Sequence, residues 1–165
     1  MKGFRQFKEG QFIVEFALVL PFFLLIVVGG MVDFGFTFNN LLSLQEVANK
    51  ASQYGAKLAA LPGYQQLPFT NAVDASASAL IASYCVKIIP SNWSASSFRP
   101  TVRIQDVQNG VSGNYRIVVV SAEFDSPVYT AFWATLVKGI NGSDKNALTI
   151  YAWASYQIPR SGFFQ

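Results

Sequence analysis

The sequence predicts an α+β protein in which a long N-terminal helix packs on a small antiparallel sheet, with a second, shorter helix beside it. Three observations predict this fold class. The first 60 residues open with an apolar run and keep apolar positions at helical spacing. A second helical pattern follows, and the C-terminal part holds three segments rich in β-branched and aromatic residues, bounded by turn residues.

The composition points to membrane contact. Of 165 residues 52% are hydrophobic and 15% aromatic, while 13% are charged, against about 25% charged in ordinary soluble domains. A chain this apolar is not disordered, and its length suits one domain or one domain with an appended segment. The net charge of +3 is small and its cations are scattered, so we expect no nucleic-acid partner.

Residues 12–32 form the predicted membrane span, because Glu15 is their only charged residue. As a helix they measure about 30 Å, the thickness of a hydrocarbon core. The run is longer than that of a signal peptide and no small-residue cleavage site follows it, so we expect it to stay attached. Three cations against one anion precede it, which places residues 1–10 in the cytoplasm and those after Asp33 on the other side.

Pro21 interrupts the apolar run and predicts a kink, because proline lacks the backbone donor of a helix interior. Gly29, Gly30 and Gly35 permit close helix approach. Two interpretations stay open. The kink is either tolerated in a lone anchor, or the helix is built to pack against other helices after leaving the lipid.

The helical pattern continues beyond the membrane over residues 34–62, and Pro62-Gly63 ends it. One face of this extension becomes small, which allows a sheet or another helix to approach closely. The small residues are Ala48, Ala51, Ser52, Gly55, Ala59 and Ala60.

Residues 63–165 are predicted to form a single α+β head. A short helix is expected within 70–85, with Thr70 or Asn71 as its cap, and a loop occupies 91–100. Strands are expected at 101–107, 115–124 and 147–158, the first two joined as a hairpin through 108–114. The apolar run 128–137 is a short helix or a hydrophobic loop. We expect it to be partly buried over the sheet edge, the alternative being a patch that meets a partner or the membrane surface.

The head lacks the residues of common catalytic and metal sites. The chain has no histidine and one cysteine, Cys85, so neither an intramolecular disulfide nor a thiolate or imidazole metal site is available. Cys85 is expected to be buried, the alternatives being an intermolecular disulfide or a lipidated thiol. Asp106, Glu123 and Asp125 fit strand ends and turns. We expect no enzyme, no cofactor and no metal, although a membrane-anchored enzyme stays a weaker alternative.

The N-terminal segment resembles a known family. A basic leader ending in Gly10, then QFIVEF with Glu15 as the fifth residue after that glycine, is similar to the processing site of type IV prepilins. The run EFALVLPFFLLIVVGGMVDFG, ending at Gly35, resembles the TadE-like minor pilins, or pseudopilins, of tight-adherence (Tad/Flp, type IVc) pili. The related TadF-like pseudopilins stay open. The family often carries a pair of cysteines where this chain has Cys85 alone, so no disulfide is carried over.

The resemblance implies cleavage between Gly10 and Gln11 by a prepilin peptidase. The divisions are then a leader at 1–10, a transmembrane helix at 11–33, its extension at 34–62 and the head. In a pilus Glu15, with Phe16, would set subunit register by pairing with the new ammonium of a neighbour. A glutamate that merely complements the helix dipole is the other interpretation of Glu15.

The implied partners are the prepilin peptidase, other major and minor pilins, and the inner-membrane assembly platform. The implied location is the bacterial inner membrane, with the head periplasmic or extracellular. The alternative is an unprocessed single-span adaptor whose head binds a protein partner.

Overall fold

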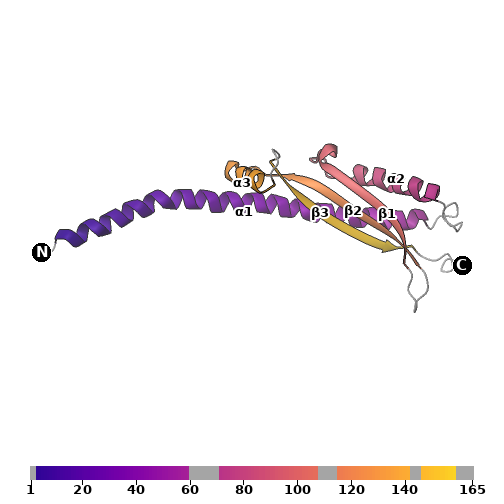
Figure 1. The fold of residues 1–165 in the computed structure, drawn as a ribbon, viewed down its shortest axis with the longest axis horizontal. Helices are drawn as coiled ribbons and strands as arrows, with labels where there is room; N and C mark the ends of the chain where they lie inside the picture. Colours follow the sequence, from indigo (N-terminus) through magenta and orange to yellow (C-terminus); the bar gives the residue numbers. More distant parts are fainter. Residues whose placement is uncertain (1–2, 60–70, 108–114, 142–145, 159–165) are drawn as a thin grey trace. The chain divides into compact units, whose positions relative to one another are not determined.

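The computed structural model describes residues 3–59, 71–107, 115–141 and 146–158 (Figure 1). It contains α1 (Gly3–Ala59), α2 (Asn71–Ile88), a short 3-10 helix η2 (Ala95–Ser97), β1 (Phe98–Val107), β2 (Tyr115–Pro127), α3 (Ala131–Asn141) and β3 (Ala147–Gln157). The chain divides into two compact units. The first joins residues 1–37 to 127–147, and the second joins 38–126 to 148–165. The predicted α+β class is confirmed.

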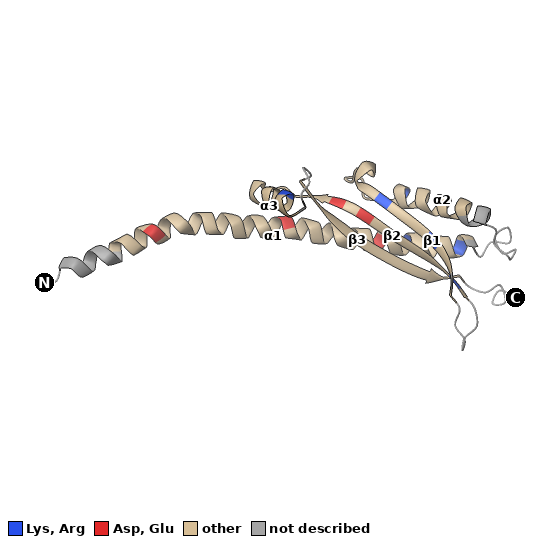
Figure 2. Ribbon diagram, viewed as in Figure 1, with Lys and Arg blue, Asp and Glu red and all other residues tan. Residues whose placement is uncertain are grey.

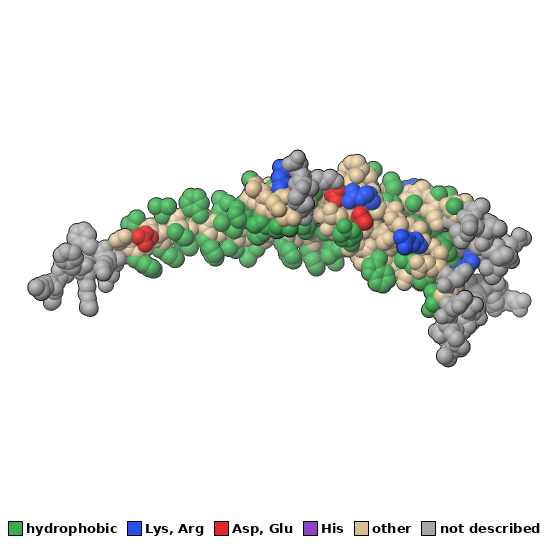
Figure 3. All heavy atoms as spheres, in the orientation of Figure 1, with side chains coloured by type: hydrophobic (Ala, Val, Ile, Leu, Met, Phe, Trp, Pro, Cys, Tyr) green, Lys and Arg blue, Asp and Glu red, His purple; other side chains and the backbone are tan. Residues whose placement is uncertain are grey.

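Helix α1 confirms the long N-terminal helix. It continues through Pro21 and ends at Ala59, while the predicted stop at Pro62-Gly63 lies outside the described residues. It begins earlier than the apolar pattern suggests, because the polar residues that precede the run are also helical. From residue 10 to residue 32, Glu15 is the only charged residue of α1, and hydrophobic side chains line this part of its surface (Figures 2 and 3).

The second unit contains a three-stranded sheet in the order β1-β2-β3. Strands β1 and β2 are antiparallel, with Phe98 opposite Phe124 and Val107 opposite Tyr115. The N–H of Ile158 donates to the carbonyl of Arg116 at 2.9 Å, beyond the end of β3. The hairpin turn expected at 108–114 lies outside the described residues.

Two boundaries differ from the sequence prediction. Residues 98–100, expected in a loop, begin β1, and β2 runs on to Pro127. Pro100 lies opposite Ala122 in a strand at the edge of the sheet, where a missing N–H is tolerated. The Ser, Asn and Pro content of 91–100 therefore predicted a loop that ends too late. Strand β1 begins at Phe98 because this residue pairs with Phe124 of β2.

The core of the second unit lies between one face of the sheet and the two helices α1 and α2. The predicted small face of α1 is buried there, with Ala48 and Ala51 fully enclosed. A Cβ atom on Gly55 would lie 2.7 Å from Ile81 Cδ1 of α2 and 2.8 Å from Val118 Cγ1 of β2. Glycine is thus required at this crossing, because a side chain would displace both neighbours.

Helix α2 confirms the second helix and extends to Ile88, beyond the stretch 70–85 from which it was predicted. The alternative cap Thr70 lies outside the described residues. The rings of Tyr54 in α1 and Tyr84 stack with centroids 4.2 Å apart. Cys85 is fully buried and unpaired with another cysteine, as expected.

In the first unit, the apolar run 128–137 contains most of the short helix α3, which confirms the helical alternative. The expected position over the sheet edge stays a prediction. Helix α3 contacts α1 through Trp133, whose indole lies against Gly30. The adjacent glycines of α1 provide the space that makes this packing possible.

Candidate functional site on the first helix

The first part of α1 whose side chains are described is exposed, and no other described part of the chain covers it. Every residue from 10 to 25 is exposed, with exposed fractions of 68% for Phe12 and 67% for Leu25. Large apolar side chains exposed in such a continuous row are unusual on a soluble monomer. This surface therefore requires lipid or a protein neighbour.

Gln11 and Glu15 are brought together by the helix. The Gln11 side-chain amide donates to Glu15 Oε1 at 3.0 Å across four residues. Helical side chains tilt toward the N-terminus, so the Glu15 carboxylate reaches back toward Gln11. One residue further on, about 100° around the helix, the rings of Phe12 and Phe16 stack with centroids 6.3 Å apart. The predicted site residues thus form two contacting pairs at the start of the apolar run, Gln11 with Glu15 and Phe12 with Phe16.

Gly10 lies within the helix rather than in extended chain. It is exposed, and a Cβ atom added there would meet nothing within 4 Å. Glycine in a helix interior costs about 1 kcal/mol relative to alanine, and here no packing of the described chain requires it. The helix unwinds most easily at such a position.

Pro21 is exposed in the middle of the apolar run, and α1 continues on both sides of it. A proline removes one backbone hydrogen bond and crowds the preceding turn. The kink predicted from the sequence stays a prediction.

Asp33 has a structural role that the sequence patterns missed. Its exposed fraction is 6%, and its carboxylate accepts hydrogen bonds from the backbone N–H of Tyr129 at 2.9 Å and of Thr130 at 3.2 Å. It also accepts one from the Thr130 hydroxyl. The carbonyl of Thr130 accepts the first hydrogen bond of α3, from Ala134 N at 2.9 Å. Asp33 therefore holds the start of α3 and satisfies backbone donors that a helix start leaves free.

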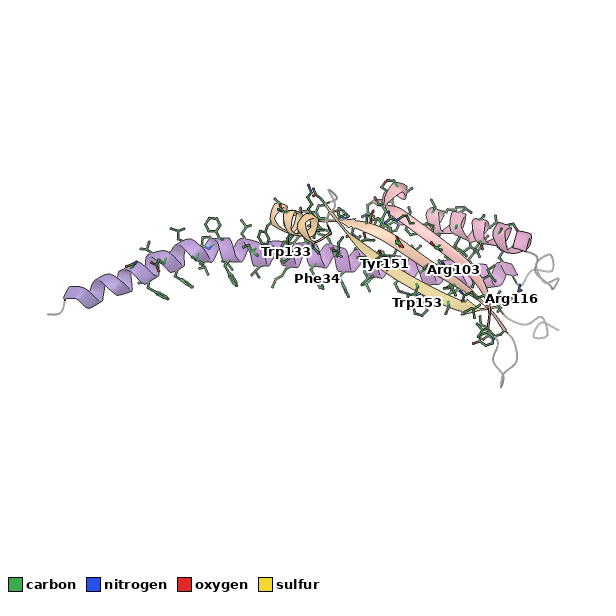
Figure 4. The ribbon with its side chains drawn as sticks, viewed as in Figure 1. Phe34, Arg103, Arg116, Trp133, Tyr151 and Trp153 are labelled. Atoms are coloured by element: carbon green, nitrogen blue, oxygen red, sulfur yellow. The ribbon has the colours of Figure 1, made fainter. Side chains whose placement is uncertain are left out.

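Trp133 supplies a second contact between α3 and α1. Its indole N–H donates to the carbonyl of Ile26 at 3.3 Å. A Cβ on Gly30 would lie 2.8 Å from the indole nitrogen, and one on Gly29 would lie 3.2 Å from Thr130 Cγ2. The pair of adjacent glycines in an otherwise bulky run was the sequence signal for this contact. Figure 4 labels Trp133 on α3 and Phe34 on α1.

The head carboxylates that the sequence singled out lie in an ion-paired cluster. Arg99 donates from its two terminal nitrogens to the two oxygens of Asp125, each at 3.0 Å, and from Nε to Glu123 at 3.3 Å. The Thr149 hydroxyl donates to Asp125 at 2.9 Å. Hydrogen bonds to Asp125 and then Glu123 raise the pKa of the Arg99 guanidinium. These contacts join the three strands on the sheet surface, and the side chain of Asp106 lies outside the described part of the chain.

In the part of the chain that the structure describes, no three His, Cys, Asp or Glu side chains come together as a metal site would require. Within the same residues, one helix is long and apolar enough to cross a membrane, Gly10–Leu58. The apolar helix indicates single-pass membrane anchoring.

Comparisons with known proteins point to the same segment. Residues 10–53 match the family described as TadE-like protein. Neither a curated protein nor a solved structure matches the chain. The match starts at Gly10 and runs through the apolar helix into the buried part of α1. Over these residues the chain is similar to TadE-like proteins, and the similar segment contains the helix that is long and apolar enough to cross a membrane.

Proposed function

We propose that this chain is a minor pilin or pseudopilin. It is made as a single-span precursor in the bacterial inner membrane, cut after Gly10 by a prepilin peptidase, and used in assembling or priming a Tad-type pilus for surface adherence. The observation that carries the proposal is the bare first part of α1. It exposes a TadE-like apolar surface that no other described part of the chain covers.

Gly10 suits the role of a processing site. The scissile bond must leave the helix to enter a protease as extended chain, and glycine makes that local unwinding least costly. Its backbone is open to an approaching enzyme, since a Cβ atom placed on it would have no neighbour within 4 Å. The cations of residues 1–10 hold the leader at the cytoplasmic face.

Cleavage gives Glu15 a partner. A chain beginning at Gln11 carries an α-ammonium one helical turn from the carboxylate, on the surface where Gln11 now donates to Glu15. A buried single charge is expensive, whereas a paired one is partly compensated. In a stack of subunits, Glu15 pairs with the ammonium of a neighbour and, with Phe16 beside it, fixes the axial offset.

The proposal divides the chain into a leader at 1–10, a transmembrane helix at 11–33, an extension at 34–62 and an extracytoplasmic head at 63–165. The partners are the prepilin peptidase, other major and minor pilins, and the inner-membrane assembly platform. The N-terminus lies in the cytoplasm, and the head lies in the periplasm or outside the cell. The same helix that anchors the precursor becomes a packing surface after the subunit leaves the lipid.

Mass spectrometry of the chain from cells that contain the cognate peptidase tests processing. A mature N-terminus at Gln11 supports the proposal, whereas an intact Met1 or a cut near Asp33 contradicts it. Gly10→Glu is expected to block cleavage because a charged side chain cannot follow the scissile bond into a narrow site. Gly35→Ala is the matched control, because Gly35 also has open space around it but lies outside the leader.

Glu15→Ala tests the register mechanism. Cleavage is expected to continue, while the yield of assembled pili falls severely. Glu46→Ala is the control on the same helix, where Glu46 forms only an exposed pair with Lys50 at 2.6 Å. Normal pilus yield from Glu15→Ala, with normal protein levels, would refute the pairing role.

The second candidate function is an unprocessed adaptor whose head binds a protein partner. The exposed rings of Tyr151 and Trp153 on β3, with exposed fractions of 64% and 67%, favour it (Figure 4). An intact N-terminus together with a pull-down that Trp153→Ala abolishes would support the adaptor. A Gln11 N-terminus and unchanged pilus assembly in Trp153→Ala would exclude it.

A further inference from the structure

Helix α3 has an exposed apolar row that the proposed pilus function does not use. Phe132, Leu136 and Ile140 recur every four residues, with exposed fractions of 44%, 40% and 75%. Tyr129, just before the helix, is 64% exposed. The opposite side of α3 holds Trp133 and Ala134, both partly buried. Helix α3 therefore has apolar side chains on two sides. One side packs on α1, and the other is exposed.

The position of α3 along α1 is fixed by contacts within the first unit. Its start is held by Asp33, the residue at which the apolar run ends. Three residues further on, Trp133 donates to Ile26 and lies against Gly30. Successive contacts thus step toward the N-terminus of α1, into the apolar run. With the span predicted at residues 12–32, the start of α3 lies at the outer end of that span, and its first turn contacts the last turns of the span.

The residue types match this depth. Tryptophan and tyrosine are enriched where lipid meets water, and Trp133 and Tyr129 occupy that level. The ring of Tyr129 packs on Phe36 with centroids 5.2 Å apart. Lys138 is the one charged residue in the sequence of α3, and a lysine at this level can extend its amine to the headgroups. The bonds that Asp33 accepts from Tyr129 and Thr130 compensate a carboxylate at the membrane boundary.

We propose that α3 is a membrane-interface helix, whose row Phe132, Leu136 and Ile140 inserts into the outer leaflet of the bilayer that α1 spans. The occupant of the exposed row is lipid, because Tyr129, just before the row, packs on the half-exposed Phe36 of α1, next to the apolar run that is itself exposed. A short amphipathic helix beside a span adds apolar contact to the anchor. It also fixes the depth and rotation of α1, since Asp33 and Trp133 join the two helices. The inference rests on α1 crossing the membrane, and it does not depend on cleavage after Gly10.

Site-directed fluorescence on the full-length precursor tests the proposal. Leu136→Cys and Ile140→Cys are each labelled with an environment-sensitive NBD dye and reconstituted into vesicles of phosphatidylethanolamine and phosphatidylglycerol. The native thiol does not interfere, because burial raises the pKa of Cys85 to about 11 and it stays protonated and enclosed. Thr135→Cys is the matched control, since Thr135 is exposed on α3 but lies about 100° around the helix from Leu136. Gln53→Cys reports full exposure to water, and Leu25→Cys reports the span itself.

We expect the dyes at 136 and 140 to react with external dithionite several-fold more slowly than those at 135 and 53. They should also be quenched by lipids that carry a nitroxide near the headgroup. Equal reaction rates at 136, 140 and 53 would overturn the proposal. If protection from dithionite rose with the protein-to-lipid ratio and no nitroxide quenching occurred, a second copy of the chain would cover the row. That result would also overturn the proposal. Loss of protection at 25 would mean that α1 does not span the bilayer, whereas cleavage in cells reports separately on the pilin function.

Discussion

The two halves of α1 belong to one helix and have opposite surfaces. From residue 10 to 25 every side chain is exposed, and most are large and apolar. In the second half, Leu44, Ala48 and Ala51 are completely buried. The glycines divide in the same way. Gly10 has nothing within 4 Å of an added Cβ, whereas Gly55 has two side chains closer than 3 Å.

This difference shows how one helix serves two environments. The second half presents alanine, serine and glycine, so that the sheet and α2 approach closely and complete the core within the chain. The first half presents phenylalanine, leucine and valine, which fit lipid or the helices of other subunits. The packing of the buried half thus depends on close fit to its neighbours. The contacts of the exposed half depend on hydrophobicity and on the charge of Glu15.

The largest expected effect comes from filling the crossing at Gly55. Gly55→Leu should destabilise the second unit by about 3 kcal/mol or more, because overpacking a close contact forces backbone shifts. The contact involves Ile81 and the stiff side chain of Val118. Urea unfolding of the full chain in detergent, followed by circular dichroism, measures the change in the free energy of unfolding. An unchanged midpoint would show that the core does not need this close approach.

The next effect concerns the packing of α3 on α1 within the first unit. Asp33→Ala removes the acceptor of two backbone N–H groups, and an unsatisfied buried donor costs about 1–3 kcal/mol. Hydrogen exchange of residues 128–141 should accelerate about tenfold or more, while exchange in α2 stays the same. Asp33→Asn, which keeps one acceptor, should fall between the two. Equal exchange in Asp33→Ala and the parent would show that Asp33 does not hold α3.

The sequence predicted the elements of the fold well, because their signals are local. Apolar spacing located α1 and α2, and β-branched runs located the three strands to within a few residues. The start of β1 was missed because its Phe98 and Pro100 are placed by pairing with β2, which a local composition does not contain. The same limit explains α3. A helix at this place was one of two predicted alternatives. Its packing on α1 brings Trp133 to Gly30, next to Gly29, and both glycines lie about a hundred residues earlier in the chain.

The candidate site divides along the same line. Gly10, Gln11, Glu15 and Phe16 were identified from their spacing, and the helix brings Gln11 to Glu15 and Phe12 to Phe16. Asp33 was noticed only as the end of the apolar run. Its three hydrogen bonds come from the distant residues Tyr129 and Thr130, so no pattern around Asp33 could have indicated them.

A smaller effect reports how well the second half of α1 and its partners close the core. Burial raises the pKa of Cys85 to about 11, from a reference value of 9.0. Above pH 9 the thiol ionises in the unfolded chain before it does so in the folded one, and this favours unfolding. The stability that the protonated, buried thiol contributes is therefore complete below pH 9 and is lost as the pH rises through 11. Between pH 8 and pH 10 the loss is about 1 kcal/mol. Urea unfolding at both pH values measures it, and Cys85→Ala should remove the difference. If Cys85 reacted with a thiol reagent at pH 8 as fast in the folded as in the unfolded protein, the core would not be closed around it.

The smallest expected effect has the opposite sign to the largest. Gly35→Ala should stabilise α1 by less than about 1 kcal/mol, because alanine restricts the unfolded chain and propagates a helix better than glycine. Its added methyl group meets nothing within 4 Å. Gly55→Ala makes the same chemical change and should destabilise, since its methyl group lies 2.7 Å from Ile81 Cδ1. Thermal unfolding of both variants in one detergent compares them directly. If both shifted the midpoint the same way, helix propensity rather than packing would govern both halves, and the contrast between them would fail.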